Sequence, residues 1–134
     1  MNSKIKMSIF GFVLVTILSG FWISQSPPAT KQYLLTVIKI NHVWRVVNAA
    51  DSSCTVKVNR NDKIIWTANG TDAKFNFNDA IFDTSSSKFY VRNGHKLQLK
   101  IKGNTKPGTY QYSVFCIADS VNAIGCSPPV IVVK

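Results

Sequence analysis

The sequence predicts an all-β domain, an antiparallel Greek-key β-sandwich preceded by one hydrophobic N-terminal helix. Three observations support this prediction. Apolar and polar residues alternate in several short runs, turn-forming residues separate those runs, and no stretch of ten residues after Gln32 has helical periodicity. Short strands at this spacing, without helical crossovers, are typical of β-sandwiches and barrels.

The N-terminal part of the chain differs from the rest. Residues 7–23 carry no charge and follow Lys4 and Lys6, which is the pattern of a secretory signal. We therefore expect a signal peptide or signal anchor over 1–26, a linker over 27–32 and a β-sandwich domain over 33–134. The sequence leaves open whether the segment is cleaved. Cleavage after the small residues Ser24 and Ser26 would place Pro27 directly after the cut. Retention as an anchor is also open, because seventeen uncharged residues lie at the lower edge of the roughly 17–25 that span a bilayer. In both cases the domain is expected to be extracytoplasmic: periplasmic, secreted or anchored through residues 7–23.

The clearest strand runs from Lys96 to Lys102, where Leu97, Leu99 and Ile101 alternate with lysines and a glutamine. Its apolar side chains should face the core. The run 54–58 alternates in the same way, and 64–67 is β-branched and aromatic. Further strands are expected over 33–40, 43–47, 75–77, 89–91, 110–117 and 130–133. Turn dipeptides lie between these runs: Asn61-Asp62, Asn69-Gly70, Asn93-Gly94, Gly103-Asn104 and Pro107-Gly108.

Several of these segments resemble the cupredoxin family. Residues 58–69 contain an Asp, then a strand ending in aromatic-x-x-Asn at Trp66 and Asn69. Residues 89–94, 97–101 and 107–112, followed by Cys116, are similar in order to the closing strands of that family. The resemblance covers roughly residues 54–134 and implies a cupredoxin-like sandwich. A proline-glycine-x-tyrosine segment also occurs in immunoglobulin-like sandwiches, so that architecture is the alternative.

The resemblance would also imply a blue-copper site, which needs two imidazoles, a thiolate and a weak axial ligand. The window after Asn69 where the family has its first histidine, residues 71–75, contains none. No His or Met follows Cys116, which lies two residues farther behind Tyr112 than is usual in the family. We therefore expect a cupredoxin-like domain without copper ligands, with no metal and no cofactor.

Other catalytic or metal-binding chemistry also lacks a motif. His42 and His95 fall in expected turns, with no Cys or carboxylate at ligand spacing. All six acidic residues are Asp and five of them lie in expected loops, where Asx turns and caps are common. No pair of carboxylates or nucleophile motif assigns acid and base roles. The sequence predicts that the protein is not an enzyme and has no catalytic residues.

Three cysteines in an exported chain allow one disulfide and one free thiol. We favour Cys116 with Cys126, which would tie the end of one strand to the connection leading into the last, contributing roughly 2–3 kcal/mol. Cys54 would then point inward as a small apolar filler. The alternative, Cys54 with Cys116, would join facing sheets as in immunoglobulin domains.

The charge gives one functional indication. Residues 27–134 hold 14 of the 16 basic residues and all six acidic ones, a net charge of +8. This charge favours either an anionic partner outside the cytoplasm (a membrane surface, an acidic polysaccharide or an acidic protein) or solubility and protection of strand edges. The sequence has no stripe of aromatic and basic residues of the kind that binds single-stranded nucleic acid, so we expect no nucleic-acid partner.

The predicted function is an exported, non-catalytic binding or structural module of unknown ligand, recognising an anionic surface or a protein. The alternative is a periplasmic metal-handling protein related to copper.

Overall fold

The computed structural model describes residues 30–124 and 128–134. The expected signal or anchor segment, its helix and Cys126 lie outside these residues. In the described ranges, no helix is long and apolar enough to cross a membrane.

The described part of the chain forms ten strands. Each predicted run is a strand, with bounds shifted by at most two residues. The two-residue β9 was not predicted, because it is too short to show alternation. The strands are β1 (Gln32–Ile40), β2 (Val43–Asn48), β3 (Thr55–Val58), β4 (Lys63–Ala68), β5 (Ala73–Phe77), β6 (Lys88–Val91), β7 (Lys96–Lys100), β8 (Gly108–Cys116), β9 (Val121–Asn122) and β10 (Val130–Val133).

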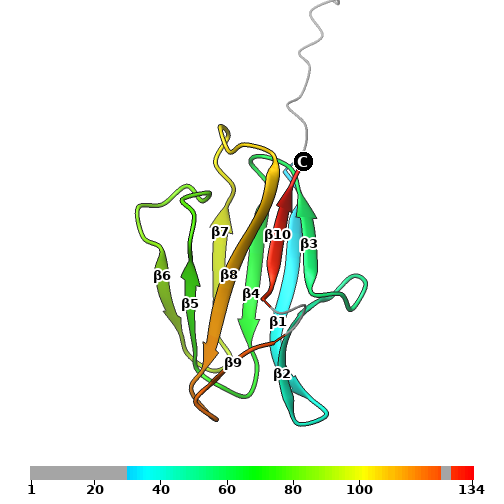
Figure 1. Cartoon of the computed structure of the whole chain (residues 1–134), viewed down its shortest axis with the longest axis vertical. Coiled ribbons are helices and arrows are strands. Elements are labelled where there is room, and N and C mark those ends of the chain that lie inside the picture. The colour runs from blue at the N-terminus through cyan, green and yellow to red at the C-terminus, as the bar shows by residue number, and fades with distance from the viewer. Residues whose placement is uncertain (1–29, 125–127) are drawn as a thin grey trace, which may run out of the picture.

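These strands form two sheets that pack face to face as a sandwich (Figure 1). The first sheet has the order β2-β1-β4-β7. The second has the order β3-β10-β8-β5-β6, and β9 pairs with the end of β8. The all-β sandwich predicted from the sequence is therefore confirmed.

The expectation of purely antiparallel sheets is corrected by one parallel pair in each sheet. β1 runs parallel to β4, with Gln32 opposite Lys63, and β10 runs parallel to β3, with Val130 opposite Thr55. Alternation along a strand tells which side chains face inward, but it carries no information about the direction of the neighbouring strand.

The core lies between the sheets and is centred on Trp66, which is fully buried. Aromatic rings from the second sheet and from the loop after β5 surround it, with centroid distances of 5.4 to 6.0 Å: Phe75, Phe77, Phe82 and Tyr112. Edge-to-face and tilted pairs of this kind add to the free energy gained from apolar burial. This cluster fixes how the two sheets face each other.

Four turns gather at one end of the sandwich, which we call the loop end: β1–β2, β4–β5, β6–β7 and β8–β9 (Figure 1). Asn41 and His42 both have positive φ, 53° and 67°, so they make the tight turn between β1 and β2. Gly70 and Gly94 have φ of 94° and 84°. These turns position the residues where the cupredoxin resemblance would place a metal.

Candidate functional site

The segment 71–75, where the cupredoxin family has its first copper-binding histidine, begins at the loop end. Here Thr71 at its start forms hydrogen bonds within the protein. Thr71 is buried, and its hydroxyl donates to the Asp72 carbonyl at 2.6 Å. The same oxygen accepts the backbone N–H of Ala118 at 3.0 Å. Thr71 thus ties the β4–β5 loop to the β8–β9 loop and closes this end of the sandwich.

Cys116 ends β8 opposite Ala73 and is fully buried with a free thiol. Burial, and then the negative charge of Asp119, raises the pKa of this thiol to about 11. The thiol is therefore protonated at neutral pH and is a poor nucleophile.

The free thiol of Cys116 disagrees with the expected Cys116–Cys126 bridge and with the alternative Cys54–Cys116 bridge. Cys54, directly before β3, is half-buried and disulfide-bonded, so it is not the inward-facing free filler that was expected. The alternation correctly predicted that Val56 and Val58 face the core, and both are buried. Cys54 lies just outside the strand, where the alternation no longer applies.

The side chain of Asp119 is also engaged. It accepts hydrogen bonds of 2.7 Å from Lys39 Nζ and from the indole N–H of Trp44. These two donors lower the pKa of its carboxyl group. The carboxylate therefore braces β1 and β2 against the β8–β9 loop.

His42 and His95 are both exposed at the loop end, in the β1–β2 and β6–β7 turns. Their backbones follow the turn geometry that the sequence predicted; His95 N, for example, donates to the Arg92 carbonyl at 2.9 Å. Among residues 30–124 and 128–134, no group of three or more His, Cys, Asp or Glu lies together as a metal site would require.

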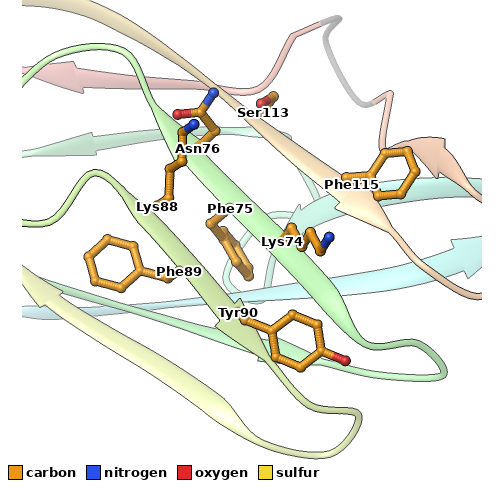
Figure 2. A pocket seen from close by; sticks show the side chains of 8 residues that line it. All are labelled: Lys74, Phe75, Asn76, Lys88, Phe89, Tyr90, Ser113 and Phe115. Carbon is orange, nitrogen blue, oxygen red and sulfur yellow. The ribbon is translucent and has the colours of Figure 1, made fainter.

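A different feature stands out on the outer face of the second sheet. Tyr90 lies opposite Lys74, and Lys74 lies opposite Phe115, so the three side chains form a row across β6, β5 and β8. Figure 2 shows Tyr90 and Phe115 on either side of Lys74. Tyr90 is 54% exposed and Phe115 is half-buried. We call this set the aromatic–lysine row.

The row lines a shallow groove of about 410 Å³. Its other outward side chains are polar or basic, and no carboxylate lines it; they are Asn76, Lys88 and Ser113 (Figure 2). A second groove of about 430 Å³ lies on the other side of Tyr90 and adds Arg92, His95 and Lys96. Basic and aromatic groups thus lie on both sides of strand β6.

Tyr90 is held in position by Asp72. Its hydroxyl donates a 2.6 Å hydrogen bond to the Asp72 carboxylate, which also accepts the backbone N–H of Asn93 at 2.7 Å. The Tyr90 bond and the Asn93 bond lower the pKa of Asp72, and the same carboxylate raises the pKa of Tyr90. The ring therefore has a fixed orientation although it is exposed.

Sequence reasoning missed the aromatic–lysine row. Alternation in residues 73–77 and 88–91 already places Lys74 and Tyr90 on the polar side of their strands. What it could not supply was the register that aligns them with Phe115, because β8 is distant along the chain.

No family model matches the chain, and no curated protein matches it. Among solved structures, an oxidised amicyanin mutant is 10% identical, with 82% of this chain and 87% of that chain covered and a TM-score of 0.46. The Cu(I) form of another amicyanin mutant is 11% identical, with coverage of 79% and 85% and a TM-score of 0.47. A chain of a heme-copper terminal oxidase dimer is 16% identical, with coverage of 78% and 65% and a TM-score of 0.43. These are similarities of strand arrangement alone.

The class of the protein is defined by its fold. Two mixed sheets with the observed strand order make the described domain a β-sandwich. Its loop end is closed by Thr71 and Asp119, and its candidate binding surface is the aromatic–lysine row.

Proposed function

We propose that this protein is an extracytoplasmic, non-catalytic binding module that recognises an acidic polysaccharide through the aromatic–lysine row. The observation that carries the proposal is the alignment of Tyr90, Lys74 and Phe115 across three neighbouring strands. The uncharged segment 7–23 behind two lysines supports export, which would expose the domain to such polymers.

The geometry of the row suits a sugar chain. Neighbouring strands lie about 4.8 Å apart, so Tyr90 on β6 and Phe115 on β8, two strands away, are separated by about 10 Å, close to the length of two linked sugar rings. An aromatic ring offers an apolar face to a sugar ring, and the fixed Tyr90 loses little conformational entropy on binding.

The charges of the groove favour an acidic polymer. Lys74 and Lys88 line the groove, and the nearby Asp72 carboxylate, which is not among the lining residues, already accepts the Tyr90 hydroxyl, so the lining itself offers a uronic acid carboxylate positive charge. A shallow, open groove admits a polymer from the side, whereas small-molecule sites usually enclose their ligand.

The test is a titration of the full chain with alginate, with a neutral glucan as the comparison polymer. We expect alginate to bind and the neutral glucan to bind much more weakly. Tyr90→Ala and Phe115→Ala should each weaken binding by about tenfold, which corresponds to about 1.4 kcal/mol. Tyr90→Phe keeps the ring and should lose less than Tyr90→Ala.

A matched pair of lysine variants separates this groove from general charge attraction. Lys74→Gln should weaken binding, whereas Lys57→Gln, on the exposed side of β3, should not. Equal losses from both variants would mean that alginate binds the net charge of the protein, and the proposal would then be wrong. Thermal unfolding of each variant checks that it is folded.

A further inference from the structure

We propose that the end of the sandwich opposite the loop end rests on an anionic lipid bilayer. We call it the terminal end, because the described chain starts and finishes there (Figure 1). It also contains the β3–β4 and β7–β8 loops. The inference concerns a different surface from the aromatic–lysine row and does not depend on the proposed ligand.

Hydrogen bonds join these four segments. The N–H of Lys31 donates to Asp62 Oδ1 at 3.2 Å, and the N–H of Lys134 donates to the Val58 carbonyl at 2.9 Å. Asn61 N donates to the Ile101 carbonyl at 3.0 Å. The first described residues, the last residues and both loops therefore form one connected surface.

This surface is strongly basic. It carries half of the 14 basic residues that follow residue 26, five of them exposed and two half-buried: Lys31, Arg60, Lys63, Lys100, Lys102, Lys106 and Lys134. Lys63 and Lys100 lie directly opposite each other on β4 and β7, and Arg60 is fixed by a 2.7 Å hydrogen bond from its Nε to the Thr105 carbonyl. Like charges placed this close favour an anionic partner.

Acidic residues compensate this charge only in part. Asp62 is buried and accepts the backbone N–H groups of Lys31 and Asn59. Asp83 is exposed near Lys100, to whose carbonyl its backbone N–H donates. Asp72 and Asp119 lie at the loop end. Asp79 lies in the β5–β6 loop, whose Ile81 carbonyl accepts the backbone N–H of Lys102. Seven basic residues outnumber Asp62, Asp79 and Asp83, so the terminal end has an excess of positive charge.

The position of the uncharged segment 7–23 identifies the partner. Only eight peptide units separate Ile23 from Lys31, and they reach at most about 30 Å when fully extended. With that segment in a bilayer, the terminal end is the part of the domain held nearest to the lipid. Juxtamembrane clusters of Lys and Arg bind anionic headgroups, and the attraction acts within a Debye length of about 8 Å.

The experiment uses the full chain in lipid nanodiscs that carry a gadolinium-chelating lipid, and NMR measures the broadening of backbone amides. In discs with about one third phosphatidylglycerol, amides of Asn104 and Lys106 should broaden several-fold more than those of Asn41 and His42. In discs of phosphatidylcholine alone, or at high salt, this difference should shrink to that of a freely tethered domain.

Two triple variants that remove the same charge provide the control. Lys100→Gln with Lys102→Gln and Lys106→Gln should abolish the dependence on lipid charge. Lys74→Gln with Lys88→Gln and Lys96→Gln, all exposed and away from the terminal end, should leave it unchanged. Equal broadening at both ends in anionic discs, no effect of lipid charge, or equal losses in the two triple variants would each overturn the proposal. Loss of alginate binding by the second triple variant alone bears on the aromatic–lysine row and not on this inference.

Discussion

Trp66 and Tyr112 form a buried hydrogen bond between the two sheets, in which the indole N–H donates to the tyrosine hydroxyl at 3.1 Å. Both side chains are buried, and their rings meet edge to face with centroids 5.7 Å apart. The pair therefore fixes the distance between β4 and β8 and satisfies a polar group in the centre of the core.

The first prediction follows from this pair. Tyr112→Phe keeps the ring but leaves the Trp66 N–H without an acceptor, so it should lower the free energy of unfolding by roughly 1–3 kcal/mol. Urea unfolding measures it. The control is Tyr110→Phe, whose hydroxyl donates to the Lys106 carbonyl at an exposed position. We expect a change within about 0.5 kcal/mol there; equal effects would contradict the role of the buried bond.

The sequence predicted the features that depend on neighbouring residues, and it did not predict those that depend on residues far apart along the chain. Alternation in Leu97, Leu99 and Ile101 is local, and the sequence correctly placed them on the inner side of their strand. The parallel pairing of β1 with β4, and the alignment of Tyr90 with Phe115, depend on contacts between distant segments. No local pattern encodes these contacts, so the mixed sheets and the candidate site emerged only from the structure.

The second prediction concerns Asp62, which is 4% exposed and accepts backbone N–H groups from Lys31 and Asn59. Asp62→Ala leaves both donors without this acceptor and should destabilise the protein by roughly 1–3 kcal/mol in urea unfolding. Asp79→Ala removes an exposed carboxylate from a loop and should have little effect. A similar loss in both variants would show that net charge, and not the buried acceptor, matters.

The third prediction concerns the disulfide. Cys116 is free, Cys54 is disulfide-bonded, and the chain has three cysteines, so we expect the Cys54 peptide to be linked to the Cys126 peptide. Closing a loop of this length would stabilise the fold by about 4 kcal/mol in the chain-entropy model. Peptide mapping without reduction checks the linkage. A linked Cys116–Cys126 pair would restore the pairing first expected from the sequence.

The fourth prediction concerns metal. Elemental mass spectrometry of the chain purified from an extracytoplasmic fraction, then dialysed against copper, should find well under one equivalent. The closed loop end is one physical reason, and the other is that no three His, Cys, Asp or Glu side chains lie together in the described part of the chain. Copper near one equivalent would support the copper-handling alternative and would contradict the proposed binding module.

The fifth prediction uses the pH dependence of stability. Burial raises the pKa of the Cys116 thiol to about 11, above its ordinary value of 9.0. Between these two values the unfolded chain loses this proton while the folded chain keeps it, so rising pH favours unfolding. The contribution of the thiol is fully present below about pH 9 and is lost as the pH rises toward about 11.

Cys116→Ala isolates this contribution from the tyrosines and lysines that titrate in the same range. The variant has a constant loss from its smaller side chain, but its stability should fall less steeply than that of the parent between about pH 9 and pH 11. Urea unfolding at a series of pH values gives the difference between the two proteins. Parallel curves would show that the thiol has an ordinary pKa and is therefore hydrated, which the closed loop end does not allow. The thiol should also react slowly with a disulfide reagent until the protein is unfolded, because only the thiolate attacks.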